Sequence, residues 1–568
     1  MSVRRVLPGA VRACAVALLV LAQAACGAAR NIPEEQPPQR RDVNYLAYYS
    51  YLQASRELRE GRLPEAERLL KEAIAKDPGS AFLHVELAEV VSRLGRTDEA
   101  LGLARKAVAL DPTNVDAYLL LADLASAQRK KDEAIAVYRK VIELDAKRED
   151  AYLQLANLLA DAGRKPEASE VLGRLVGQLP GSYLGYYQLG RLQSEGKEFE
   201  AAEGSLKKAL VINPEFVAGE KYLGILYDHW GRPADALAAY RRLLEMNPHD
   251  TEIRLRVGEI HLQRREWAQA LEQYQALLVF EPGNLLVRTK VGIVQLQQGA
   301  LEEAAKTLLG VLAQEPGNTR VRSILALVYE EQGRLEDAAR ELHAVLDMEP
   351  DAVDDRMRLG IVYRRLKRHA EALAQFEKIV ELAPKTAQAY VQIALTHDDA
   401  GDMAAAEKTV ARGLEAVPGD GDLLFQKGVY LEKRKDIPAA VAAFREAIKA
   451  DPRNANAYNY LGYLFAERGE NLDEAVSLIQ RAVDLAPDNG YYVDSLGWAY
   501  YQKGMLAEAM AQMERAASLV SDDPVILEHL GDVYSKAGRS AEAAEAWRKA
   551  LAITPDNAAL KRKIDDAK

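Results

Sequence analysis

The 568-residue sequence predicts an all-α fold built as a solenoid, on three observations. An acidic or polar residue followed by Pro recurs at a fixed spacing along the chain, as in Asp77-Pro78 and Asp111-Pro112. Alanine recurs in step with it, always at the same distance before the Pro, as in Ala66 and Ala100. The intervening segments carry apolar residues in the pattern of two short amphipathic helices joined by a turn. A fixed period of this kind is typical of arrays of stacked repeats.

The predicted repeats occupy residues 45–557. Working back from each Pro gives fifteen repeats of about 34 residues each, with one extra residue in the thirteenth, near Gly469–Leu472. Two repeats lack the Pro and have Ala146 and Ser521 in its place. Residues 558–568 follow the last repeat, and we predict that they form a capping helix, because the end of a stack needs a polar outer face.

Each predicted repeat has the residue sizes that close packing of two helices requires. Position 20 is Ala in all fifteen repeats, and position 8 is always Ala or Gly. Small side chains at these positions let the helices approach, while larger residues at positions 7, 11 and 24 fill the remaining space. Position 7 is aliphatic in thirteen repeats, the exceptions being Gln53 and Lys427. Gly at position 15 suits the left-handed end of the first helix, and Pro at position 32 ends the second.

This pattern resembles the tetratricopeptide repeat (TPR) family, whose signature has a small residue at position 8, Ala at 20 and Pro at 32. The resemblance implies a right-handed α-solenoid of about 15 helix–turn–helix repeats covering some nine-tenths of the chain. It also implies a groove lined by positions 2, 5, 9, 12 and 13 of the first helices, which binds segments of other proteins. The family's carboxylate clamp and asparagine ladder are not expected, because consecutive repeats lack the required Lys and Asn.

Residues 1–25 are predicted to be a signal peptide, which is set aside before the fold is considered. The apolar segment 13–22 is too short to be a permanent membrane-spanning helix. The residues before this apolar segment include no acidic residue and three basic ones, Arg4, Arg5 and Arg12.

The residues that follow resemble the lipobox of bacterial lipoproteins. The segment Ala-Ala-Cys-Gly at 24–27 implies cleavage before Cys26 and attachment of lipid to its thiol. Gln23 departs from the Leu that this family prefers, so an ordinary secretory signal or a retained anchor remains an alternative. Residues 26–44 are rich in Pro and charge and are predicted to tether the array to the membrane. The Gly after the Cys matches the pattern for sorting to the outer membrane, with the array facing the periplasm.

Composition excludes several classes of protein. The formal charge is 74 − 85 = −11, and loss of the three signal arginines would make it 71 − 85 = −14. A chain this acidic is a poor binder of nucleic acid. Cys14 lies within the signal and Cys26 would carry lipid, so an internal disulfide is not expected.

No catalytic, cofactor or metal motif stands out in the sequence. HExxH, a phosphate-binding GxxxxGK[ST] and a GxGxxG after a strand are all absent, and the eight His never form an i, i+4 pair. The repeats leave no room for a separate catalytic domain. We therefore expect neither an enzyme nor a bound cofactor or metal.

The first candidate site is aromatic and lies in repeats 13 and 14. Large rings accompanied by amides and a carboxylate suit recognition of peptides or glycans. The alternative is that these rings pack on one another beside the inserted residue. The candidate groove residues are Asn456, Asn459, Tyr463, Tyr491, Asp494, Trp498 and Tyr501.

The second candidate site is a basic stripe in repeats 7–10, where Arg replaces the usual apolar residue at position 4. Such a stripe could bind an anionic polymer or an acidic partner. The alternative is structural, with Glu281, Glu315 and Glu349 forming ion pairs with the arginines seven residues later. The stripe comprises Arg254, Arg288, Arg322 and Arg356 at position 4, and Arg256, Lys290 and Arg358 at position 6.

These features predict a lipid-anchored scaffold that mediates protein–protein interactions in envelope assembly or export. The expected partners are peptide segments or subunits of envelope machines. Two alternatives are a glycan- or polysaccharide-binding protein of an exopolysaccharide system and a chaperone for exported proteins. A secreted or periplasmic location without the anchor is also open.

Overall fold

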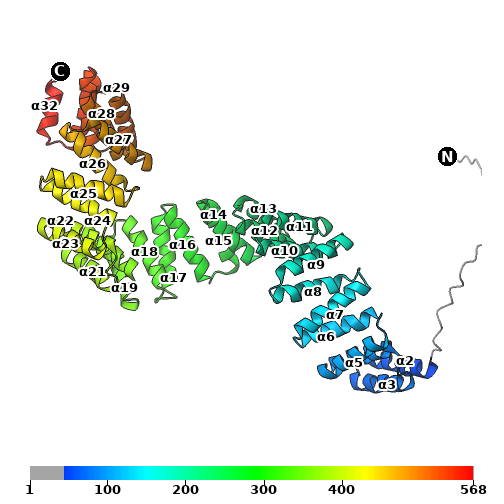
Figure 1. Ribbon diagram of the computed structural model, residues 1–568. Coiled ribbons are helices and arrows are strands. Elements are labelled where there is room, and N and C mark those ends of the chain that lie inside the picture. Colours follow the sequence, from blue (N-terminus) through cyan, green and yellow to red (C-terminus); the bar gives the residue numbers. More distant parts are fainter. Residues whose placement is uncertain (1–43, 567–568) are drawn as a thin grey trace, which may run out of the picture. The chain divides into compact units, whose positions relative to one another are not determined.

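The structure is a computed structural model that describes residues 44–566 (Figure 1). Within this range the chain forms thirty-one α-helices and no strand, which confirms the predicted all-α repeat architecture. The predictions for the signal peptide, Cys26 and the tether as far as residue 43 lie outside the described residues. No helix in the described range is both long enough and apolar enough to cross a bilayer.

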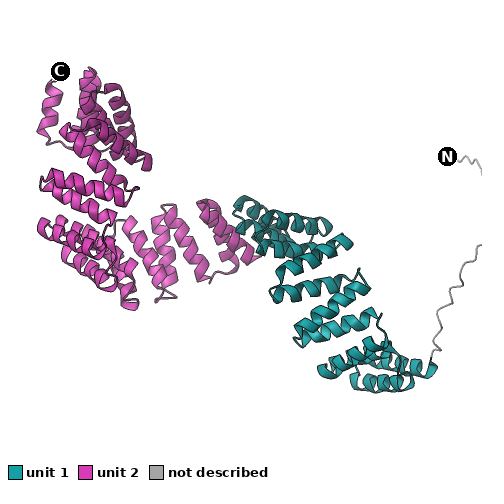
Figure 2. Cartoon of the chain, in the orientation of Figure 1, with its two compact units in different colours: residues 1–246 teal, residues 247–568 magenta. Residues whose placement is uncertain are grey.

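The chain divides into two compact units, which meet in sequence between Met246 and Asn247 (Figure 2). The first unit holds six helix pairs, one for each of repeats 1–6. Their first helices are α2 (Tyr45–Arg59), α4 (Ala81–Arg93), α6 (Val115–Ala127), α8 (Glu149–Asp161), α10 (Tyr183–Glu195) and α12 (Val217–His229). Their second helices are α3 (Leu63–Lys76), α5 (Thr97–Leu110), α7 (Lys131–Leu144), α9 (Lys165–Gln178), α11 (Phe199–Ile212) and α13 (Pro233–Met246).

The second unit holds nine helix pairs and a final single helix. The first helices are α14 (Thr251–Gln263), α16 (Leu285–Gln297), α18 (Thr319–Glu331), α20 (Val353–Arg365), α22 (Ala387–Asp399), α24 (Gly421–Lys433), α26 (Ala455–Arg468), α28 (Gly490–Lys503) and α30 (Pro524–Lys536). The second helices are α15 (Trp267–Phe280), α17 (Leu301–Leu312), α19 (Leu335–Met348), α21 (His369–Leu382), α23 (Met403–Ala416), α25 (Ile437–Ala450), α27 (Leu472–Leu485), α29 (Leu506–Leu519) and α31 (Ser540–Ile553). The single helix is α32 (Ala558–Asp566).

Most first helices begin directly after a residue whose side chain caps them, the exceptions being α8, α12, α20 and α22. In many repeats this residue is Asn, Ser or Asp, and its side chain accepts a backbone N–H of the first turn. Asn114 Oδ1 accepts from Ala117 N at 2.9 Å, and Asn318 Oδ1 accepts from Val321 N at 3.1 Å. Such caps satisfy N–H groups that have no partner within the helix.

The turn inside each repeat has the same backbone conformation whether or not it contains Gly. Position 15 has a positive φ at Gly95 (81°), and also at Arg129 (59°) and Lys435 (64°), where a side chain makes this conformation costly. The extra residue of repeat 13 is accommodated in this turn, between α26 and α27, where Gly469 and Asn471 both have positive φ.

The core runs between the helices and consists largely of the small and apolar positions of the repeat. Ala66, Ala304 and Ala440, all at position 20, have no exposed surface. At the C-terminal end, α32 buries Leu560 and Ile564 against a cluster that contains Trp547. This helix lies where the sequence predicts the capping helix.

Candidate peptide-binding surfaces

A pocket of about 510 Å³ lies over three first helices of the second unit, α16, α18 and α20. Its apolar lining comes from four half-buried side chains, two on α16 and two on α18. Three of them stand at positions 9 or 12, which the TPR resemblance assigns to the groove, and one at position 6. We call this the groove pocket, and its apolar side chains are Ile293, Leu296, Ile324 and Leu327.

Charged groups surround this apolar lining. Arg320 is exposed and has no hydrogen bond or ion pair within the described part of the chain. Arg358 donates to the Ser323 carbonyl at 3.4 Å and lies 3.6 Å from Glu330. Burial raises the pKa of Glu330, and Arg358 opposes this rise. Two carboxylates, those of Glu349 and Asp355, also line the pocket. The pocket therefore offers an apolar surface with charges of both signs around it, and Arg320 is the cation that is free to pair with a ligand.

Three of the four arginines at position 4 of the predicted basic stripe hold the turn before their own helix. Arg322 Nε and Nη2 donate to the Pro316 carbonyl at 3.1 and 2.8 Å, and the same guanidinium pairs with Glu341 on α19. Arg254 makes the corresponding contacts to Pro248 O and Gln273. Arg356 makes them to Pro350 O and Gln375. Each of these three arginines thus joins a proline carbonyl to the second helix of its repeat.

The predicted ion pairs between these arginines and the glutamates seven residues earlier are wrong. Glu281 and Glu315 instead accept hydrogen bonds from Asn284 and Asn318, at 2.7 and 2.9 Å. Glu349 accepts one from the Thr319 hydroxyl at 2.6 Å. The glutamates lie on the turn, and the guanidinium groups reach past them to the carbonyl and to the second helix. These contacts support a structural role by a different mechanism from the one predicted.

Arg288 differs from the other three arginines at position 4. Gln273, Glu341 and Gln375 all stand at position 23 of their repeats, but the residue at position 23 in the repeat of Arg288 is Thr307. The Thr307 hydroxyl donates to Gln295 at 2.8 Å. No partner of Arg288 is found between residues 44 and 566.

The basic residues at position 6 contact different groups from those at position 4, because they pair with glutamates. Arg256 and Lys290 both reach Glu259, at 3.2 and 2.9 Å. Arg358 is the one member of the predicted stripe among the residues that line the groove pocket. The seven residues therefore do not act as one set, because four of them pair with carboxylates, two bind neutral oxygens and Arg288 has no partner in the described range.

The predicted aromatic site is a network of side chains that includes His529, which sequence reasoning did not single out. His529 Nδ1 lies 3.1 Å from both carboxylate oxygens of Asp494, which is only 7% exposed. The Trp498 ring stacks on His529, with centroids 4.3 Å apart, and on Tyr501 at 5.0 Å. His529 stands on α30, one repeat beyond the predicted residues, so only the fold reveals it.

The other members of the predicted aromatic site make fewer contacts with one another. Asn456 Oδ1 accepts a hydrogen bond from the Tyr492 hydroxyl at 2.7 Å. Burial raises the pKa of Tyr463, and Glu467 and Asp494 add to the rise. Asn459 Oδ1 is buried without a hydrogen-bond partner among residues 44–566, whereas Tyr491 is 56% exposed. The contacts of Trp498 support the packing interpretation, and a binding role for this set remains a prediction.

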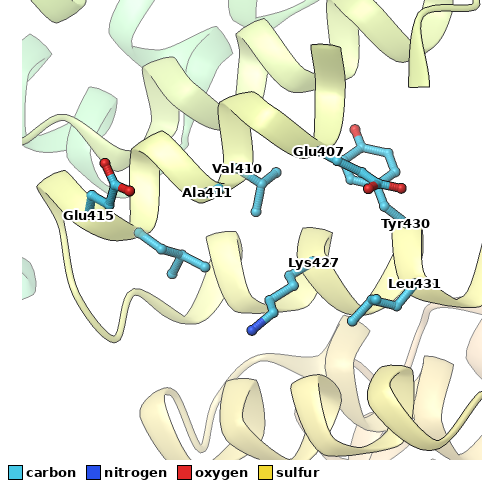
Figure 3. Close-up of a pocket in the computed structure, with 8 residues that line it drawn as sticks. Glu407, Val410, Ala411, Glu415, Lys427, Tyr430 and Leu431 are labelled. Carbon is cyan, nitrogen blue, oxygen red and sulfur yellow. The ribbon is translucent and has the colours of Figure 1, made fainter. Parts of the chain in front are cut away.

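A second pocket, of about 420 Å³, lies between α23 and α24 (Figure 3). Val410, Leu414 and Leu431 contribute apolar walls, and Lys427 stands on α24 across from Val410. Lys427 occupies position 7, where the aliphatic residues Leu325 and Leu461 are fully buried in their own repeats. Because Lys427 is exposed instead, the space that an aliphatic side chain would fill stays open. We call this the α23–α24 pocket.

Profiles described as tetratricopeptide repeat match the chain at residues 51–115, 85–151, 125–193, 225–285, 324–389, 391–446, 425–490 and 524–557. The chain belongs to the tetratricopeptide repeat family. TPR solenoids are protein–protein interaction scaffolds, and this is the role of the fold described above. No group of three or more His, Cys, Asp or Glu in the described range is placed to hold a metal ion.

Similar proteins and structures cover the chain to different extents. The TPR repeat-containing protein PA4667 of Pseudomonas aeruginosa is 38% identical over 101 residues, which make up 18% of this chain and 17% of that protein. Among solved structures, the APC/C hetero-tetramer Cut9-Hcn1 matches 85% of this chain and 96% of its own, at 16% identity and a TM-score of 0.38. Yeast Tom70 matches 86% of this chain and 99% of its own, at 14% identity and a TM-score of 0.39.

Proposed function

We propose that this TPR protein is a lipid-anchored scaffold on the periplasmic side of the outer membrane, where it binds peptide segments of envelope assembly or export proteins. The location is supported by the signal-like residues 1–25 and the lipobox-like segment that ends at Cys26 and Gly27. The binding role is supported by the family and by one observation above all, the groove pocket with its apolar lining and unpaired cation.

The groove pocket suggests the chemistry of its ligand. Ile293, Ile324 and Leu327 are partly exposed, so an apolar side chain of a partner would displace water from their surface. A carboxylate next to that side chain could pair with Arg320. We therefore expect a partner segment that carries a large apolar residue beside an acidic one.

Affinity capture from solubilised membranes tests the binding role. Leu327→Gln places a polar amide in the pocket lining and should reduce the recovery of partner proteins at least tenfold, which is about 1.4 kcal/mol of binding free energy. The matched control is Val429→Gln on α24, which makes a similar change at the same position 9 of another repeat. Equal recovery by both variants, at equal thermal stability, would refute the assignment of the groove pocket.

The anchor is tested separately. Cys26→Ser removes the proposed lipid attachment site, so the protein should lose its labelling by a radioactive fatty acid and its retention in the outer-membrane fraction. Retention of both by the variant would contradict the anchor while leaving the groove pocket untouched. Binding of purified protein to a polysaccharide array, or suppression of aggregation of an unfolded outer-membrane protein, would instead favour the glycan-binding or chaperone alternative.

A further inference from the structure

The first helix of the array exposes an unusual amount of apolar and aromatic surface. On α2, Tyr45 is 81% exposed, Leu46 66% and Tyr49 60%. Tyr48 and Leu52 are also about half exposed, and no charged side chain occurs between Tyr45 and Ser55. We call Tyr45, Leu46, Tyr48, Tyr49 and Leu52 the N-terminal aromatic surface. Contiguous exposed surface of this kind marks a site of interaction.

The opposite end of the array shows what a capped end looks like. Helix α32 presents charged side chains such as Lys561 and Arg562 to solvent and buries Leu560 and Ile564. End repeats of solenoids normally carry a polar outer face, because no further repeat covers them. Helix α2 breaks this rule, which singles out its exposed face as a surface for interaction.

The sequence that precedes α2 has too few apolar residues to bury the N-terminal aromatic surface. Between Gly27 and Val43, the only large apolar side chains are Ile32 and Val43 themselves. Two such residues cannot bury five large side chains. The length of this segment is nevertheless informative, because the 18 residues at 27–44 span at most about 60 Å, even when fully extended. If Cys26 carries lipid, α2 is confined within that distance of the bilayer.

We propose that the N-terminal aromatic surface docks on the interfacial region of the lipid bilayer to which the chain is anchored. Tyrosine suits this region because its ring enters the apolar layer while its hydroxyl stays among the headgroups. Leu46 and Leu52 supply side chains that favour the acyl boundary. The anchor, which is part of the proposed function, keeps the surface at an effective concentration on the order of millimolar, so even weak intrinsic affinity is sufficient.

The charges nearby predict how docking depends on lipid composition. Arg56 is paired with Glu60 at 3.1 Å, and Arg62 is paired with both Glu57 and Glu60. Arg59 donates to the Ser55 carbonyl and has no carboxylate partner in the described part of the chain, so these five side chains carry a net charge of only 3 − 2 = +1. The surface therefore gains little from anionic headgroups. Docking should be nearly equal on vesicles of phosphatidylcholine and on vesicles that also contain phosphatidylglycerol, and it should change little with salt.

Fluorescence quenching by brominated lipid tests this proposal on the full lipidated chain reconstituted into phosphatidylcholine vesicles. Tyr49→Trp adds one emitter to the native Trp230, Trp267, Trp498 and Trp547. Bromine placed near the headgroup end of the acyl chains should quench this added emission strongly. Bromine placed near the methyl end should quench it less. The matched control is Tyr491→Trp, also at an exposed tyrosine, whose emission should not change.

The outcomes separate docking from anchoring. If the protein floats with the vesicles but the emission added by Tyr49→Trp is not quenched, the anchor stands and the docking proposal is overturned. If the protein does not float, both are overturned. A concentration-dependent blue shift of the added emission without vesicles would show that a second copy covers the surface, which would also overturn the proposal. Adding Tyr45→Ser and Leu46→Ser to the reporter variant should reduce quenching while flotation persists.

Discussion

Gly428 on α24 lies directly against the ring of Phe444 on α25, so that a Cβ at position 428 would stand 2.5 Å from Phe444 Cε1. Such a separation is far shorter than ordinary van der Waals contact, and Phe444 is fully buried. The same relationship between positions 8 and 24 recurs at Gly224 and Tyr240, Gly258 and Tyr274, Gly360 and Phe376, and Gly531 and Trp547. In these five repeats, glycine at position 8 therefore makes room for the aromatic ring at position 24.

Gly428→Ala should destabilise the second unit by about 1–3 kcal/mol, because the ring or the helix must shift to admit the methyl group. The matched control is Gly310→Ala on α17, where a Cβ would meet no atom within 4 Å. Alanine there should stabilise by about 0.4–1 kcal/mol, since it restricts the unfolded chain. Chemical denaturation measures both changes, and a loss of stability at position 310 equal to that at 428 would contradict the packing argument.

The period of the sequence was enough to predict the helix pairs, because each of their boundaries depends on local residues. The N-cap Asn114 and the turn residue Gly95 act within a few residues of their own position. The short segment between α26 and α27 absorbs the inserted residue where the sequence places it, because a turn tolerates insertion better than a packed helix.

Contacts between helices were harder to predict than the helices themselves. The partner of Arg322 lies on α19, in the second helix of the same repeat, whereas sequence reasoning looked seven residues back to Glu315. His529 was missed because its partner Asp494 stands one repeat earlier, on α28. The groove pocket was missed for a different reason, since Ile293 and Leu327 are apolar and were not considered as ligand-binding residues. Their groove positions could have indicated them.

The basic stripe gives a second prediction. Arg322→Gln removes hydrogen bonds to Pro316 O and the ion pair with Glu341, and should cost about 1.5–3 kcal/mol of stability. Arg288→Gln is the matched control at the same position 4, and should change stability by less than about 0.5 kcal/mol because no partner is lost. Thermal unfolding compares the two. Equal, small effects would mean that the contacts of Arg322 add nothing to folding.

A third prediction concerns Trp498. Since its ring stacks on His529 and Tyr501, Trp498→Ala should lower the free energy of unfolding by about 2 kcal/mol, less than for a fully buried Trp. Tyr491→Ala is the control, because this tyrosine is 56% exposed and should leave stability nearly unchanged. If Trp498→Ala keeps full stability but loses partner capture, the aromatic set is a binding site rather than a packed cluster.

A fourth prediction concerns pH. Burial raises the pKa of Glu86, and the neighbouring Glu89 carboxylate adds to the rise. The folded protein therefore holds this proton more tightly than the unfolded chain, so stability falls as the pH rises past the ordinary Glu value of about 4.3. Glu86→Gln cannot ionise and should stabilise the protein at neutral pH, with the gain vanishing in acid.

Glu65 provides the opposite case. A hydrogen bond from Arg68 lowers the pKa of Glu65, so its contribution is present at neutral pH and disappears as the pH falls. Glu65→Gln should therefore destabilise slightly at neutral pH and have no effect in acid. Unfolding midpoints measured across pH for both variants should move in opposite directions. A gain for Glu86→Gln that persists unchanged in acid would exclude ionisation as its cause.

The α23–α24 pocket exists because Lys427 stands where most other repeats have an aliphatic residue. Lys427→Leu should fill the space beside Val410 and Leu414 and raise the free energy of unfolding by about 0.5–2 kcal/mol, as cavity-filling changes commonly do. No ion pair of Lys427 is found within residues 44–566, so none is lost in the exchange. Lys408→Leu, on the exposed surface of α23, should give no such gain. Equal stability of the two variants would mean that the pocket does not close around the new leucine, and that its shape is set by the backbone rather than by Lys427.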